Sequence, residues 1–157
     1  SAEKLEACRR FGAVLAVDYQ QQDFAVEIKA HTGGRGVDVV LDPVGAAYLS
    51  RNLEVLAAGG RLVCSGLMGG RRAEIDLGRV LGRSLRLIGS RLRQRPVSEK
   101  TRIIRQFEER FGALLADGRL APVVDRVFPV AEAEAAHAYV RANRNIGKVI
   151  LEVPETR

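Results

Sequence analysis

Short apolar runs alternate with helical segments along the first hundred residues, and this alternation restricts the fold more than any other feature of the sequence. Runs such as VDVVLD at residues 37–42 are too short for a helix and lack the polar alternation of a half-exposed strand, so they predict strands buried on both faces. The segments between them carry apolar residues at helical spacing. Strands that alternate with helices favour an α/β fold with a parallel sheet covered by helices on both faces.

The regular alternation of predicted strands and helices ends near the C-terminal part of the chain. Strands are expected at residues 14–19, 37–42, 61–66 and 85–90. Helices are expected at residues 2–10, 23–30, 46–56, 77–81 and 98–116. A strand, a helix and a final strand are then expected at residues 123–130, 132–143 and 148–153. Because this last part breaks the alternation, we place a boundary at Asp117-Gly118 and expect the tail to pack elsewhere.

The charge balance is basic, with 25 Lys and Arg against 19 Asp and Glu. This excess permits an anionic partner such as a nucleic acid or a dinucleotide, but the aromatic residues, at 5%, are not interleaved with the arginines as a base-stacking surface requires. No apolar run approaches the roughly 20 residues of a membrane helix, and the first residues, SAEKLEACRR, have no signal-peptide pattern. A cytoplasmic setting without membrane contact is therefore expected.

The cysteines and histidines predict neither a metal centre nor nucleophilic catalysis. Cys8 and Cys64 are far apart and lack metal-ligand spacing, so both are expected to be reduced core residues. His31 and His137 have no cysteine, serine or paired carboxylate at a suitable spacing, so helix-end and helix-surface positions are expected for them. We therefore expect no zinc ligand and no catalytic side chain in these residues.

Four segments in one order carry a resemblance to a known family. They are SAEK at residues 1–4 with Tyr19, TGGRGVDVVLDPVG at 32–45, GGRLVCSGLMGG at 59–70 and NRNIGKVILEV at 143–153. Together they resemble the zinc-free medium-chain dehydrogenase/reductase family, in its quinone oxidoreductase branch. The segment IGSRLRQR at residues 88–95 is similar to the end of the family's sixth core strand.

The resemblance implies an incomplete doubly wound parallel Rossmann sheet with a C-terminal strand-helix-strand tail. Residues 1–118 would form part of an NADP-binding domain, and residues 119–157 would belong to a GroES-like catalytic domain. By this resemblance, the first two Rossmann strands and the glycine-rich loop that holds a pyrophosphate would be absent from these residues. The strand at 14–19 would therefore lack its usual neighbour, and it would pair with residues 37–42, exchange with another molecule or be held loosely.

The resemblance also assigns cofactor contacts. Ser1, Lys4 and Tyr19 would bind the 2′-phosphate of NADP(H), because a hydroxyl and an ammonium suit a phosphate, whereas an NAD enzyme offers Asp or Glu to the ribose. Further contacts follow from the strand ends and the tail. They are Val44 and Gly45 on the adenosine side, Gly66, Leu67, Met68 and Gly69 on the nicotinamide side, Ser90, Arg91 and Leu92 at the carboxamide and phosphate, and Asn145. Each has an alternative interpretation as an ordinary turn, cap or surface residue.

The function implied is hydride transfer from NADPH to quinones or α,β-unsaturated carbonyls, with the protein supplying orientation rather than a nucleophile. As a fragment the chain is expected to be inactive, and a homodimer through the edge strand at residues 85–90 is expected.

Two alternatives stay open. One is an RNA-binding module, and the other is a structural piece without any ligand. The RNA-binding face would consist of Arg71, Arg72, Arg79, Arg83, Arg86, Arg91, Arg93 and Arg95.

Overall fold

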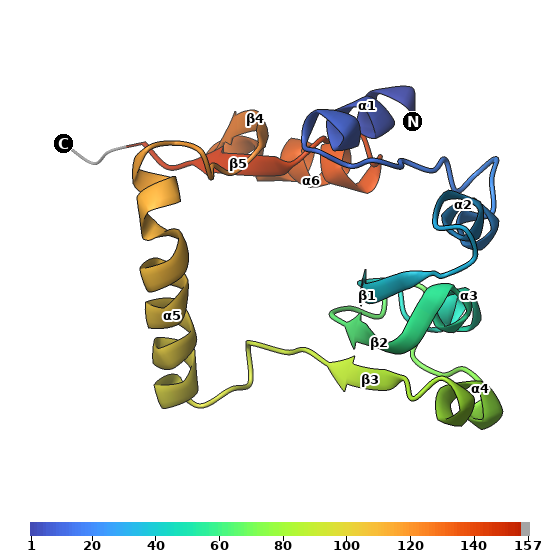
Figure 1. Cartoon of the computed structure of the whole chain (residues 1–157). Helices are drawn as coiled ribbons and strands as arrows, with labels where there is room; N and C mark the ends of the chain where they lie inside the picture. Colours follow the sequence, from blue (N-terminus) through green and yellow to red (C-terminus); the bar gives the residue numbers. More distant parts are fainter. Residues whose placement is uncertain (155–157) are drawn as a thin grey trace. The chain divides into compact units, whose positions relative to one another are not determined.

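The structure is a computed structural model that describes residues 1–154. The chain folds into two compact units, Ser1–Arg95 and Pro96–Arg157 (Figure 1). The boundary between the two units lies before the long helix α5 (Val97–Ala116), whereas the boundary predicted from the sequence, at Asp117-Gly118, lies after this helix. Although α5 continues the alternation of strands and helices, it therefore belongs to the same compact unit as the C-terminal tail.

The first unit contains a parallel sheet in the order β1-β2-β3, formed by β1 (Val37–Asp42), β2 (Leu56–Cys64) and β3 (Arg86–Gly89). This arrangement confirms the predicted α/β fold with parallel strands. The strand β2 begins five residues before its predicted start, because Leu56 already pairs with Val37 before an irregularity in the register.

The first unit contains four α-helices, and polar side chains cap all of them except α3. They are α1 (Ala2–Arg10), α2 (Phe24–His31), α3 (Leu49–Val55) and α4 (Leu77–Gly82). Asp23 accepts a hydrogen bond from the Ala25 N–H at 2.7 Å, and Asp76 accepts one from the Arg79 N–H at 3.1 Å. The predicted helix at 46–56 is divided into a 3₁₀ turn, η1 (Ala46–Tyr48), and α3.

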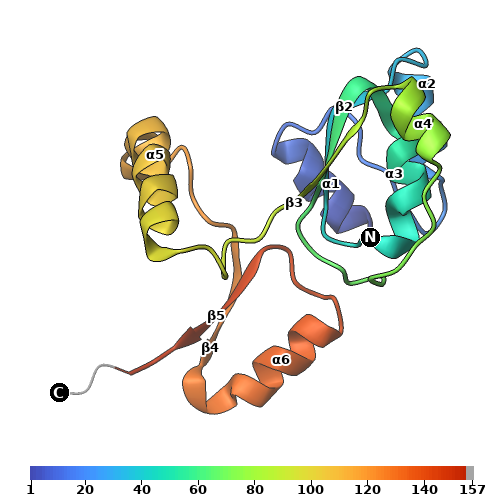
Figure 2. The same cartoon turned by 90° about the horizontal axis from the view of Figure 1, so that it is seen from below.

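The core lies on one face of the sheet. Its centre consists of Leu53, Leu56, Leu62 and Leu85. Figures 1 and 2 show α3 and α4 together on this side of the strands. The row Val40, Leu62 and Leu87 faces the helices, and the alternate row contains Leu41, which is 69% exposed.

The prediction of a strand at residues 14–19 is wrong. These residues contain no strand, and part of the segment lines an apolar hollow of about 400 Å³ beside Ile28, His31 and Val37. The backbone of a strand needs a partner for its hydrogen bonds, and in a Rossmann sheet two further strands would separate this segment from β1. Pairing with β1, one of the three expected outcomes, does not occur, and β1 remains an edge strand within the described residues.

The second unit contains a strand-helix-strand motif, as the sequence predicts. β4 (Val124–Pro129) and β5 (Lys148–Glu152) pair in parallel, and α6 (Ala133–Arg141) connects them after the 3₁₀ turn η2 (Val130–Glu132).

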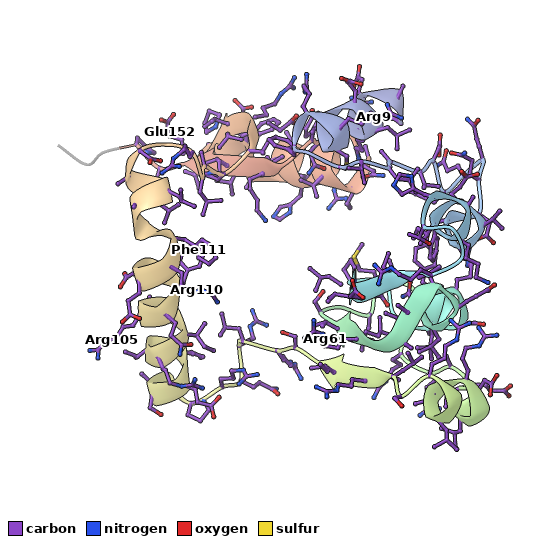
Figure 3. All side chains as sticks on the ribbon, viewed as in Figure 1. Arg9, Arg61, Arg105, Arg110, Phe111 and Glu152 are labelled. Carbon is purple, nitrogen blue, oxygen red and sulfur yellow. The ribbon has the colours of Figure 1, made fainter. Side chains whose placement is uncertain are left out.

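On α5 the ring centroids of Phe107 and Phe111 lie 5.2 Å apart, and the guanidinium of Arg110 lies 5.9 Å from the centroid of Phe111 (Figure 3).

The two cysteines differ from each other. Cys8 lies on the exposed face of α1, so its prediction as a core residue is wrong; its neighbour Ala7 is the buried residue of that helix. Cys64 is half-buried and packs against the core, as expected. His31 ends α2 and His137 lies on the surface of α6, and both are exposed as predicted. Among the described residues, no helix has both the length and the apolar composition needed to span a membrane.

Candidate functional site

The carboxyl ends of the three strands of the first unit meet at one edge of the sheet. Asp42 pairs in register with Cys64, and Cys64 pairs with Gly89. Beyond these ends lies a hollow of about 620 Å³, lined by Cys64, Ser65, Gly66, Leu67, Gly89, Ser90 and Arg91. Open α/β sheets bind ligands outside the carboxyl ends of their strands, so this hollow is the candidate site.

The structure brings together part of the predicted nicotinamide side. Gly66, Leu67, Ser90 and Arg91 line the hollow. The Ser90 N–H donates to the Cys64 carbonyl at 2.9 Å, which continues the pairing of β3 with β2 into the loop. Met68 is 86% exposed, and neither it nor Leu92 lines the hollow. The cofactor contacts of all these residues stay predictions.

The glycines of residues 66–70 serve the packing of the loop itself. A Cβ at Gly66 would lie 2.6 Å from the Pro43 carbonyl oxygen, and one at Gly69 would lie 2.7 Å from Cγ1 of Val44. Glycine at these positions therefore allows the loop after β2 to approach the loop after β1. The sequence interpretation, that small residues let a flat ring approach the backbone, does not explain this contact.

Cys64 lines the hollow and was not among the predicted site residues. Burial, and secondarily the negative charge of Asp42, raise the pKa of the Cys64 thiol. The side chain therefore stays a neutral thiol near pH 7 and forms part of the wall rather than a nucleophile. Ser65 and Gly89 were also missed, although they lie within the predicted strands at residues 61–66 and 85–90. The cross-strand register, in which Cys64 pairs with Gly89, brings these two residues together.

The residues predicted for the 2′-phosphate lie elsewhere in the first unit. Ser1 caps α1, because its Oγ accepts a hydrogen bond from the Lys4 N–H at 3.5 Å. Tyr19 lies in an exposed turn. None of these three residues lines the 620 Å³ hollow. Their phosphate role stays a prediction.

Asn145 and Val44-Gly45 have local roles in the structure. The Asn145 side-chain amide donates to the Gly147 carbonyl at 2.8 Å, which is the turn role considered as its alternative. Gly45 adopts φ +83° and lies before η1. Contacts of these residues with a cofactor stay predictions.

The arginines proposed as an RNA-binding face come from several elements. Arg83 donates to the carbonyls of Glu54 and Leu56, at 3.3 and 2.9 Å, and Arg79 lies 4.0 Å from the carboxylate of Asp76. These two side chains therefore have partners within the chain. Within residues 1–154, no three His, Cys, Asp or Glu side chains gather in a group that fits a metal ion.

Comparison with known proteins gives the family. Residues 11–151 match the family described as zinc-binding dehydrogenase. The chain is 34% identical to 2-haloacrylate reductase of Burkholderia sp over 95% of the chain and 45% of that protein. It is 28% identical to quinone oxidoreductase-like protein 2 of Bos taurus over 98% of the chain and 44% of that protein. The chain thus spans less than half the length of these relatives.

Solved structures agree with the fold. The crystal structure of an NAD-dependent alcohol dehydrogenase has a TM-score of 0.80 and 32% identity, covering 98% of this chain and 42% of that one. The crystal structure of 2-haloacrylate reductase has a TM-score of 0.79 and 31% identity, covering 98% and 48%. None of these names supports RNA binding. Because the family match covers nearly the whole sequence, the chain belongs to the zinc-binding dehydrogenase family, that is, to the medium-chain dehydrogenase/reductases.

Proposed function

We propose that this chain is the cofactor-binding part of a reductase that transfers hydride from NADPH to quinones or α,β-unsaturated carbonyl compounds. The observation that supports it most is the hollow at the carboxyl ends of β2 and β3. The name of the relative 2-haloacrylate reductase denotes a substrate whose double bond is conjugated to a carboxylate, and such a bond accepts hydride. Because the relatives are about twice as long, hydride transfer is proposed for a protein that contains these residues together with the remainder of the family's length.

The residues of the hollow suit a nicotinamide ring. Leu67 offers an apolar wall, and Ser90 and Arg91 offer polar groups for the carboxamide and a phosphate. A bound nicotinamide cofactor would supply the hydride. The chain's own residues would hold the ring and limit the access of water, and Cys64, as a neutral thiol, would complete the wall. The described residues do not fit the zinc ion in the family's description, and we assign no step to it.

The choice of coenzyme tests the assignment of Ser1, Lys4 and Tyr19. We expect the chain to bind NADPH more tightly than NADH, and Lys4→Gln to reduce this preference by roughly tenfold, because one charged contact with the 2′-phosphate is lost. Calorimetric titration of both coenzymes measures the preference. Lys100→Gln, on α5, is the matched control and should leave it unchanged.

Equal affinity of the unmodified chain for the two coenzymes would remove all three residues from the phosphate role. The question has to be settled on this chain itself, because one of the similar solved structures is of an NAD-dependent enzyme.

We further propose that β3 pairs with β3 of a second copy. All four of its residues are exposed and it is an edge of the sheet, and edge strands offer unpaired backbone groups to a partner. Light scattering should give the mass of a dimer, and a monomer at micromolar concentration would contradict this contact.

A further inference from the structure

Asp42 is a buried carboxylate at the tip of β1. It is 3% exposed, and none of the ion pairs described for residues 1–154 includes it. Its Oδ1 accepts a hydrogen bond from the Val44 N–H at 2.7 Å, and its Oδ2 accepts one from the Gly45 N–H at 3.0 Å. A buried carboxylate is costly unless hydrogen bonds satisfy it, and here two backbone groups do so. The side chain therefore fixes the turn at residues 43–45.

The turn at residues 43–45 and Ala46 after it hold the loop after β2, at residues 66–70, in place. The Pro43 carbonyl accepts from the Met68 N–H at 3.2 Å, and the Val44 carbonyl accepts from the Gly69 N–H at 2.7 Å. In the opposite direction, the Ala46 N–H donates to the Gly70 carbonyl at 3.0 Å. Three backbone hydrogen bonds thus connect the turn fixed by Asp42 with the loop at residues 66–70.

We infer that Asp42 is a positioning residue for the nicotinamide side of the site. It does not line the 620 Å³ hollow, but the loop that carries Gly66 and Leu67 does. The carboxylate of Asp42 fixes the conformation of the turn, and the turn fixes the position of the loop at residues 66–70 through hydrogen bonds. The loop in turn forms the wall of the hollow against which a nicotinamide ring would lie. Binding to a loop already held in place avoids the cost of ordering it, which is the advantage of a preorganised site. This inference rests on the proposed function and names a residue that acts at that same site.

The variant Asp42→Asn tests the inference. Asparagine has nearly the same shape, but it keeps one acceptor oxygen and turns an NH₂ group toward the second backbone N–H. We expect NADPH to bind roughly tenfold to a hundredfold more weakly, as the loss of one charge-assisted hydrogen bond implies. Asp38→Asn is the matched control: Asp38 lies on the same strand, is exposed and pairs with Arg35 at 2.8 Å. It should leave binding unchanged.

Amide hydrogen exchange separates positioning from general stability. In Asp42→Asn, exchange at the Ala46 and Gly69 amides should accelerate by about tenfold or more, whereas exchange at Leu62 in the core should stay as in the unmodified chain. Equal acceleration at all three amides would mean a merely structural role and would overturn the inference. So would unchanged exchange at Ala46 and Gly69, or unchanged affinity for NADPH.

The exchange measurement needs no cofactor. If the unmodified chain failed to bind NADPH, the proposed function would fail, and the exchange rates would still decide whether Asp42 holds the loop. Should Asp42→Asn not fold, Asp42→Ser serves in its place, since a hydroxyl accepts from one of the two N–H groups, and the same outcomes apply.

Discussion

Replacement of Gly45 by alanine should lower the free energy of unfolding of the first unit by about 3–5 kcal/mol and abolish measurable NADPH binding. Gly45 has φ +83° and ψ −127°, a conformation that L residues rarely adopt. A Cβ there would lie 2.8 Å from the Gly70 carbonyl oxygen and 3.3 Å from Cα of Leu67. Both are backbone atoms, so the steric clash can be removed only if the turn at residues 43–45 and the loop at residues 66–70 move apart. Chemical denaturation and coenzyme titration measure the two effects.

Gly34→Ala is the control for this substitution. Gly34 has the same φ of +83°, but a Cβ at that position would meet nothing within 4 Å. Its cost should be that of the backbone conformation alone, about 1–2 kcal/mol. If the two variants were equally stable, the contact between the loops would not exist as described.

Leu62→Ala should destabilise the first unit by about 2–5 kcal/mol, because it removes a fully buried side chain from the centre of the core. This is a large part of the stability of a typical domain. Leu87→Ala is the matched control, since Leu87 pairs with Leu62 in the same row of the sheet but is 43% exposed. It should cost about 1 kcal/mol. Urea denaturation of both variants measures the difference, and similar midpoints would place the core elsewhere.

The strands of the first unit were predictable where burial depends on neighbours within the sequence. Residues 37–42 form β1 and residues 61–64 lie in β2, because the partners of both runs lie in the same chain; residues 65–66 of the predicted strand lie beyond its end. Residues 14–19 show the same kind of run, but no described strand pairs with them. An apolar run therefore predicts a tendency toward burial, and only a partner for the backbone converts it into a strand.

The site was predictable as a place and only partly as a set of residues. The rule that ligands bind beyond the carboxyl ends of strands, together with the family resemblance, predicted Gly66, Leu67, Ser90 and Arg91, and these four residues line the candidate hollow. It missed Cys64, because the alternation of a strand shows which residues share a face but does not show where a pocket opens. The contact between Gly45 and the loop of Gly70 joins residues 25 positions apart, and local patterns carry no information on it.

We propose that a phosphorylated dinucleotide binds along the carboxyl ends of β2 and β3. Amide chemical shifts of the isotopically labelled chain, recorded during titration with NADPH, test it most directly. We expect the amide shifts of residues 65–70 and 89–91 to change, and those of Gly34 and Gly59, near the opposite ends of the strands, to stay unaffected. Changes confined to those opposite ends, or no changes at saturating NADPH, would contradict it.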